Sequence, residues 1–201
     1  MSKKVAIVAG ATGLVGQELV RQLCSRDDYS AVVALVREPG GKMFRDLGEK
    51  LVVRVLPTGD DVIAGDEFYC AIGTTIKKAG SQEAFRAVDH DLVIDLAKRA
   101  KLGGVARVVV VTAVGSDLNS GFFYSRVKGE TERDLKALDL KQLEIFQPSL
   151  LLGERSEFRL GERAAVLLSP LLSLVLVSRL AKYAPIHARE LARKMIAGES
   201  L

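Results

Sequence analysis

Residues 5–17 read Val5-Ala-Ile-Val-Ala-Gly10-Ala-Thr-Gly13-Leu-Val-Gly16-Gln17, and this stretch decides the fold. A short apolar run meets a cluster of glycines, and an amphipathic stretch follows over residues 14–26. This order predicts a strand, a phosphate-binding turn and a helix. Gly10 allows a tight turn, Gly13 lets backbone N–H groups approach a pyrophosphate, and Gly16 lets the helix pack closely on the strand.

The spacing of these glycines is G-x-x-G-x-x-G, which differs from the standard G-x-G-x-x-G fingerprint of dinucleotide-binding proteins. Exposed N–H groups and the helix dipole favour a phosphate at this position. A glycine-rich turn without a ligand is the alternative. The residues that we expect to contact a dinucleotide here are Gly10, Thr12, Gly13, Leu14, Val15 and Gly16.

The composition fits a single domain over residues 1–201, of which residues 149–201 are expected to form a substrate-side cap. Hydrophobic residues make up 48% and charged residues 27%, which excludes a disordered chain. The net charge of +4 is mild, and the basic residues are scattered without aromatic neighbours, so we expect no nucleic-acid partner.

Several features bear on compartment and partners. Residues 1–4 run directly into the first strand and predict no signal peptide, and Cys24 and Cys70 are expected to be reduced core residues, so we expect a cytoplasmic protein. The apolar segment 164–177 is too short to span a bilayer and is interrupted by Pro170. It is expected to form a buried helix, a pocket wall or a subunit interface, with interfacial membrane contact as the alternative. Stable membrane insertion is not expected, and the chain is expected to be a monomer or a homodimer.

Strand and helix patterns alternate along the chain, which predicts a doubly wound parallel sheet of the Rossmann type. Strands that are apolar along their whole length suit a sheet covered on both faces. The link over residues 57–66 is too short for a full crossover helix. The strands are expected at 5–9, 31–36, 51–56, 67–72, 107–112 and 143–147, and the helices at 14–26, 82–102, 124–138, 159–183 and 188–197.

Ligands of such sheets bind beyond the carboxyl ends of the strands. Arg37 ends the second strand, where an arginine accommodates the 2′-phosphate of NADP, so NADP(H) is the expected cofactor. NAD remains possible, with Glu38 on the ribose. At the ends of later strands, the residues expected to border the dinucleotide are Ala71, Gly73, Thr74, Pro148 and Leu150.

A second chemical signal follows the fifth strand. Tyr124 and Lys128 are four residues apart and share one face of a helix. A phenol is a poor acid–base at neutral pH, and a nearby ammonium favours the phenolate. The pair therefore predicts proton transfer by Tyr124, with Lys128 as its electrostatic partner and as a ligand of the nicotinamide ribose. A purely structural pair is the alternative. We expect no metal site, because neither His90, on an exposed helix face, nor His187 has metal-ligand spacing.

These motifs resemble the atypical members of the short-chain dehydrogenase/reductase superfamily, and more closely the Tat-interacting oxidoreductase family, which is related to a metastasis-suppressor protein. The similarity covers nearly the whole chain. Its stretches are Gly10-Ala-Thr-Gly-Leu-Val-Gly16, Ala71-Ile-Gly-Thr-Thr-Ile-Lys-Lys-Ala-Gly80, Phe85-Arg-Ala-Val-Asp89, Phe123-Tyr-Ser-Arg-Val-Lys-Gly-Glu130, Pro148-Ser-Leu-Leu-Leu-Gly153 and Pro185-Ile-His-Ala-Arg189. The resemblance implies NADP(H) binding and hydride transfer to or from an unidentified carbonyl or alcohol.

The resemblance carries over unevenly at the third catalytic position. The superfamily commonly has paired serines after the fifth strand, whereas this chain has Thr112-Ala113. Thr112 or Ser116 would then orient the substrate oxygen. A substrate with apolar surface is expected from the apolar cap. If neither hydroxyl reaches the substrate, the chain would be a catalytically weak NADPH sensor or scaffold that binds a protein partner.

Overall fold

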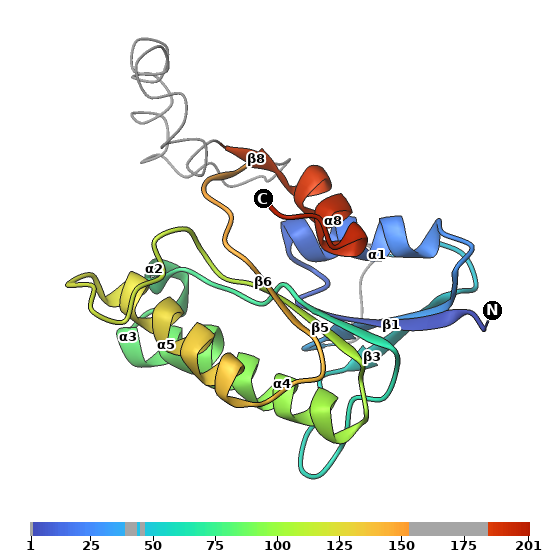
Figure 1. Ribbon diagram of the computed structural model, residues 1–201, viewed down its shortest axis with the longest axis horizontal. Helices are drawn as coiled ribbons and strands as arrows, with labels where there is room; N and C mark the ends of the chain where they lie inside the picture. The colour runs from blue at the N-terminus through green and yellow to red at the C-terminus, as the bar shows by residue number, and fades with distance from the viewer. Residues whose placement is uncertain (1, 39–43, 45–46, 153–184) are drawn as a thin grey trace.

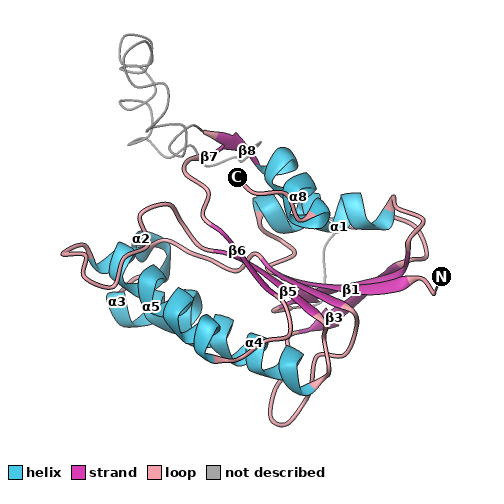
Figure 2. Ribbon diagram, in the orientation of Figure 1, coloured by secondary structure: helices cyan, strands magenta, loops and turns pink. Residues whose placement is uncertain are grey.

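The computed structural model describes residues 2–38, 44, 47–152 and 185–201, and a six-stranded parallel sheet forms its centre (Figures 1 and 2). The strand order is β3-β2-β1-β4-β5-β6, so β1 lies between β2 and β4 where the order reverses. This confirms the expected doubly wound parallel sheet. The strands are β1 (Lys4–Ala9), β2 (Tyr29–Val36), β3 (Leu51–Val55), β4 (Glu67–Cys70), β5 (Arg107–Val111) and β6 (Leu143–Phe146).

Helices cover both faces of the sheet because successive strand residues point to opposite sides. Ala6 and Val8 pack with α1 (Leu14–Cys24) and α8 (Ala188–Ala197), whereas Ile7 and Ala9 pack toward α4 (Leu92–Leu102) and α5 (Phe123–Ala137). Figure 1 shows α1 and α8 on one face and α4 and α5 on the other. Each apolar strand therefore contributes to two cores, which explains its lack of a polar face.

The helix expected over residues 82–102 forms as a continuous run of three segments. These are α3 (Gln82–Arg86), the π-helical segment η1 (Ala87–Asp91) and α4. Ser81 caps the run, since its hydroxyl accepts a hydrogen bond from the Ala84 N–H at 3.1 Å. The short helix α2 (Ile76–Ala79) precedes it. A single π-helical turn inside an α-helix often marks a functional site.

The structure corrects one expectation, about the burial of β3, and agrees with another, about the link over residues 57–66. The edge strand β3 exposes Val52, Val53 and Val55, so its apolar sequence is not covered on both faces. An edge strand has a neighbour on one side only, and here β2 is that neighbour. Residues 57–66 contain no helix, as expected from their length.

Only part of the expected cap is described. The strands β7 (Leu151–Leu152) and β8 (Ile186–His187) form a small parallel pair. Next in the chain, α8 packs along α1, and Gln22 Nε2 donates to the Arg189 carbonyl at 2.9 Å. The helix expected at 159–183 and the apolar segment 164–177 lie outside the described residues. No helix in the described part of the chain is long and apolar enough to cross a membrane.

A buried polar network joins the sheet to α8 at the end opposite the glycine turn. Glu67, the first residue of β4, accepts hydrogen bonds from Tyr29 at 2.6 Å and Tyr69 at 2.5 Å. Arg107, the first residue of β5, forms two bonds of 2.7 Å to Glu144 and donates to the Met195 carbonyl at 2.6 Å. Its other amino group donates to the Tyr69 hydroxyl at 2.9 Å. These contacts hold the C-terminal end of α8 against the sheet and so stabilise the fold.

Candidate functional site

The glycine turn follows β1 and has no room for side chains at two positions. Gly10 has φ of +76°, and a Cβ there would lie 2.5 Å from the Ala71 carbonyl oxygen. A Cβ on Gly16 would lie 2.1 Å from the Gly10 carbonyl oxygen. Gly10 therefore allows the turn to pass the end of β4, and Gly16 allows α1 to pack against the turn.

The N-terminus of α1 is open to an anion. Gly13 is its N-cap residue, with no side-chain capping bond and no acidic residue in the first turn. The Gly13 N–H donates to the Gly10 carbonyl at 2.9 Å, which closes the turn. Gln17 donates to the Thr12 carbonyl at 2.9 Å, and Thr12 itself is exposed. The free N–H groups and the positive end of the helix dipole are suited to a phosphate. Leu14 and Val15 pack into the core and anchor this end of α1.

Arg37 lies directly beyond the carboxyl end of β2, which neighbours β1 in the sheet. It and Glu38 are both exposed. No hydrogen bond or ion pair joins Arg37 to another part of the chain that the structure describes. Its expected contact with a 2′-phosphate stays a prediction.

The loop after β4 passes over a buried carboxylate. Ala71 continues the sheet, and its N–H donates to the Ala9 carbonyl at 2.9 Å. The Thr74 N–H donates to Asp89 Oδ2 at 2.8 Å. A Cβ on Gly73 would lie 3.4 Å from Asp89 Oδ1 and 4.0 Å from Lys128 Nζ. The exposed Gly73 backbone is therefore the thin cover over an Asp89–Lys128 pair.

Tyr124 and Lys128 lie one turn apart on α5 but in different environments. Tyr124 is 39% exposed, whereas the Lys128 side chain is 5% exposed and its Nζ lies 2.7 Å from Asp89 Oδ1. The Tyr124 ring packs on Phe85, with the two centroids 5.5 Å apart. The structure thus brings Gly73, Thr74 and Lys128 together and leaves the Tyr124 phenol partly open to solvent.

Asp89 is the site residue that sequence reasoning missed. It is 1% exposed and comes from the π-helical segment η1. The sequence feature that could have revealed Asp89 is a second pair of residues with a four-residue spacing, Phe85 and Asp89. Phe85 and Asp89 on one helix face Tyr124 and Lys128 on the other, with Phe85 against Tyr124 and Asp89 against Lys128.

The two candidate hydroxyls after β5 both have partners within the chain. Thr112 is buried, and its hydroxyl donates to Glu132 Oε1 at 2.7 Å. Gln147 also donates to the Glu132 carboxylate, at 2.8 and 2.9 Å. Ser116 is half-buried, and its hydroxyl donates to the Ala113 carbonyl at 2.7 Å. Ser116 is thus held by one backbone carbonyl, whereas Thr112 is held by a buried carboxylate that sequence reasoning also missed.

The segment after β6 borders the same end of the sheet. The Val114 N–H donates to the carbonyl of the buried Pro148 at 3.0 Å, which ties this segment to the loop after β5. The Leu150 carbonyl accepts from the Ile186 N–H at 3.0 Å. Their expected contact with the nicotinamide end stays a prediction.

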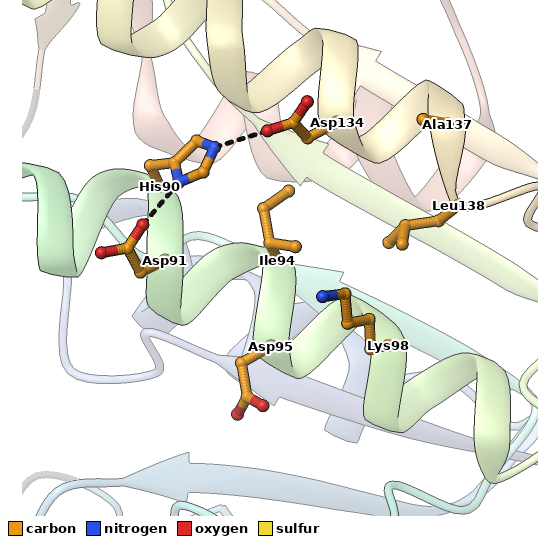
Figure 3. Close-up of a pocket in the computed structure, with 8 residues that line it drawn as sticks. All are labelled: His90, Asp91, Ile94, Asp95, Lys98, Asp134, Ala137 and Leu138. Carbon is orange, nitrogen blue, oxygen red and sulfur yellow. Dashed lines mark hydrogen bonds and ion pairs between the residues drawn. The ribbon is translucent and has the colours of Figure 1, made fainter.

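A surface pocket of about 430 Å³ lies between α4 and α5 (Figure 3). It corrects the expectation that His90 is exposed, because His90 is 8% exposed and lies between two carboxylates. Its Nδ1 is 2.6 Å from Asp91 Oδ1 and its Nε2 is 2.9 Å from Asp134 Oδ2. Hydrogen bonds from Arg133 and then His90 hold the pKa of Asp134 at about 2. The histidine thus links the π-helical segment η1 to α5, and Figure 3 shows it at one end of the pocket.

The fold and the glycine turn define a Rossmann-type α/β protein. Among solved structures, the PhqB reductase domain from Penicillium fellutanum has a TM-score of 0.69 at 16% identity, covering 98% of this chain and 64% of that one. The Bordetella bronchiseptica enzyme WbmH in complex with NAD+ has a TM-score of 0.67 at 15% identity, covering 97% and 72%. At such low identities, these similarities show the fold alone.

Sequence relatives identify the family more narrowly. The family described as HIM1 matches residues 45–177. Protein FMP52, mitochondrial, from Eremothecium gossypii is 34% identical over 199 residues, which span 96% of this chain and 87% of the relative. Protein HTATIP2 from Rattus norvegicus is 31% identical over 167 residues, spanning 81% and 69%. The chain therefore belongs to the HIM1 family, and the resemblance to the Tat-interacting oxidoreductases is confirmed.

The same relatives contradict the expected cytoplasmic location. FMP52 proteins from Eremothecium gossypii, Candida glabrata and Saccharomyces cerevisiae are all named as mitochondrial. The expectation was wrong because it rested on a missing signal peptide and on reduced cysteines. Both features bear on secretion and oxidation, and neither distinguishes the cytoplasm from another reducing compartment.

Proposed function

We propose that this protein is an NADP(H)-binding oxidoreductase of the atypical short-chain dehydrogenase/reductase type. Its reaction would be hydride transfer to or from a carbonyl or alcohol. The observation that carries the proposal is the α1 N-terminus, which has no side-chain cap and follows a turn in which Gly10 and Gly16 exclude any Cβ. A pyrophosphate fits a site of that kind.

The preference for NADP(H) over NAD(H) rests on Arg37. A guanidinium is always charged and binds phosphate with two parallel hydrogen bonds. Arg37 stands beyond β2, beside the glycine turn, where the adenine ribose of a dinucleotide would lie. Glu38 is the neighbour that would hold an unphosphorylated ribose instead.

The chemistry would be divided between the cofactor and the chain. When bound, the nicotinamide would supply or accept the hydride. Tyr124 would hold or release the proton at the substrate oxygen, and Lys128 would provide the positive charge beneath it. Ser116 or Thr112 would orient that oxygen. Phe122 is 80% exposed and immediately precedes α5, which supports a substrate with apolar surface.

Calorimetric titration with NADPH and NADH tests the proposal. We expect a single site with tighter binding of NADPH. Arg37→Gln should remove the preference for NADPH and leave NADH binding unchanged, whereas the exposed Arg133→Gln serves as a matched control and should behave as wild type. An unchanged preference in Arg37→Gln would remove Arg37 from the site. If folded wild-type protein binds neither dinucleotide, the proposed function is wrong.

Catalysis is tested separately with Tyr124→Phe. This variant should bind NADPH as wild type does and lose turnover in a panel of aldehydes and ketones monitored by NADPH absorbance. Equal turnover in the two proteins would exclude Tyr124 as the proton donor.

A second candidate function is NADPH sensing without turnover, combined with binding of a protein partner. The observation that favours it is the Thr112 hydroxyl, which is buried and donates to Glu132 instead of facing a substrate. Micromolar NADPH binding without oxidation of NADPH by any carbonyl in the panel would favour this function. Clear turnover of one compound would exclude it.

A further inference from the structure

Asp89 occupies an unusual position in the helix that follows α2. It is 1% exposed and lies in the π-helical segment η1, between α3 and α4. The Thr131 hydroxyl on α5 lies 3.1 Å from the Asp89 backbone carbonyl and 2.8 Å from the Val127 carbonyl of its own helix, and its single proton serves one of them at a time. The π-helical turn therefore packs against α5, and its Asp89 carboxylate contacts both α5 and the loop after β4.

The two carboxylate oxygens of Asp89 have different partners. Oδ2 accepts the Thr74 N–H at 2.8 Å and so fixes the loop after β4. Oδ1 lies 2.7 Å from Lys128 Nζ, close enough for a direct ion pair. This ammonium is the charge partner of Oδ1 and compensates the burial of the carboxylate. An aspartate that is 1% exposed is rare unless it is paired, and here Lys128 and the Thr74 N–H are its two partners.

The Oδ1 atom faces the thin cover formed by Gly73. A Cβ there would be 3.4 Å from Oδ1, so the exposed Gly73 backbone passes directly over the ion pair. Gly73 belongs to the loop at the carboxyl end of β4, next to the glycine turn after β1. The pair therefore lies beneath the crevice in which the proposed dinucleotide would bind.

We propose that Asp89 is a positioning residue, which holds Lys128 and the loop after β4 together as one receptor for the nicotinamide half of the cofactor. The inference rests on the proposed function. One carboxylate performs both tasks. Its charge balances the buried Lys128 ammonium, and its Oδ2 atom fixes the position of the Thr74 backbone N–H. The alternative is a buried ion pair that only supports the fold.

Two substitutions separate the two tasks. Asp89→Asn removes the charge but keeps an oxygen that can accept the Thr74 N–H. Asp89→Ala removes both. Amide hydrogen exchange at Thr74 should accelerate in Asp89→Ala and remain close to wild type in Asp89→Asn. Asp91→Asn is the matched control, because Asp91 lies in the same π-helical turn but contacts His90 and not Lys128.

Ligand titrations distinguish positioning from support of the fold. The probes are NADPH and adenosine 2′,5′-bisphosphate, which carries only the adenine half of the cofactor. Both Asp89 variants should bind NADPH at least about tenfold more weakly, with the larger loss in Asp89→Ala, and should bind the bisphosphate as wild type does. Equal losses for both probes would indicate a structural role and overturn the proposal.

The remaining outcomes separate this proposal from the proposed function. If wild-type protein binds NADPH and both variants bind it equally well, the role of Asp89 is wrong and the proposed function stands. If wild-type protein binds neither probe, both are wrong. Should the variants fail to fold, NADPH added to wild type must shift the amide resonances of Gly73 and Thr74, and unshifted resonances would overturn the role of Asp89.

Discussion

Replacing Gly13 by Asp separates anion binding from folding at the glycine turn. Gly13 has φ of −79° and ψ of 170°, a conformation that any residue adopts, and it is the N-cap of α1 without a side-chain capping bond. An aspartate there would accept the free N–H groups of the first turn and interact favourably with the helix dipole. The new carboxylate would occupy the position proposed for the pyrophosphate.

The two effects have opposite signs. Capping should stabilise the fold by roughly 0.3–1 kcal/mol. For a protein of this size that raises the melting temperature by about 1–4 °C. A carboxylate about 4 Å from a phosphate charge costs about 4 kcal/mol at an effective dielectric constant of 20. Because each 1.4 kcal/mol is about tenfold in affinity, NADPH should bind roughly 10²–10³-fold more weakly.

Thermal unfolding and calorimetric titration of the same sample measure both effects. Gly121→Asp adds the same charge in an open loop, where a Cβ meets nothing within 4 Å, and should leave NADPH affinity unchanged. A stable Gly13→Asp protein that binds NADPH like wild type would refute the reasoning. A large loss of stability would refute the described conformation of Gly13.

Three further predictions concern the scaffold. Gly16→Ala should destabilise the protein by about 1–3 kcal/mol or more in urea unfolding, because its Cβ would lie 2.1 Å from the Gly10 carbonyl oxygen. Gly73→Ala is the control and should unfold like wild type. Similar free energies of unfolding for the two variants would contradict this prediction. Gly129→Ala should lower the melting temperature and expose residues 117–118 to protease, since its Cβ would lie 2.6 Å from Asp117 C and Leu118 N. An unchanged digestion pattern would count against the packing of α5 on this loop. Burial alone would raise the pKa of Glu67, but hydrogen bonds from Lys4, Tyr29 and Tyr69 hold it below its ordinary 4.5, so its contribution to stability is present above pH 4.5 and is lost as the pH falls further. Burial, and then the hydrogen bond to Glu67, raise the pKa of Tyr29 above its ordinary 10.0, so stability is also lost as the pH rises beyond 10. Tyr29→Phe should weaken this alkaline loss. Urea unfolding across pH 3–11 measures both the acid and the alkaline loss, and an unchanged alkaline loss in Tyr29→Phe would exclude Tyr29 as its cause.

Local sequence patterns were enough to predict the six strands of the sheet and the helices at 14–26, 82–102, 124–138 and 188–197, but not the short α2. The first strand was expected at 5–9 and forms at Lys4–Ala9, and the last helix was expected at 188–197 and forms there. Apolar β-branched runs bounded by glycine or proline report strands directly, because the signal is local. The burial of β3 could not be predicted in this way, since coverage of an edge strand depends on chain segments elsewhere in the sequence.

The candidate site was predictable only where one element carries the whole signal. The glycine turn and the Tyr124–Lys128 spacing each lie within one local stretch. The partners of Lys128 and Thr112 come from other elements, since Asp89 approaches from η1 and Glu132 reaches the residue after β5 from α5. His90 shows the same limit, because the sequence shows its neighbour Asp91 but not Asp134 across the helix pair.

Amide chemical shifts measured during titration with NADPH test the central claim most directly. The account predicts that the resonances of Gly13, Leu14 and Val15 shift together and saturate at one equivalent, because their N–H groups would face the pyrophosphate. Saturable binding that shifts other residues and leaves these three amides unchanged would contradict it.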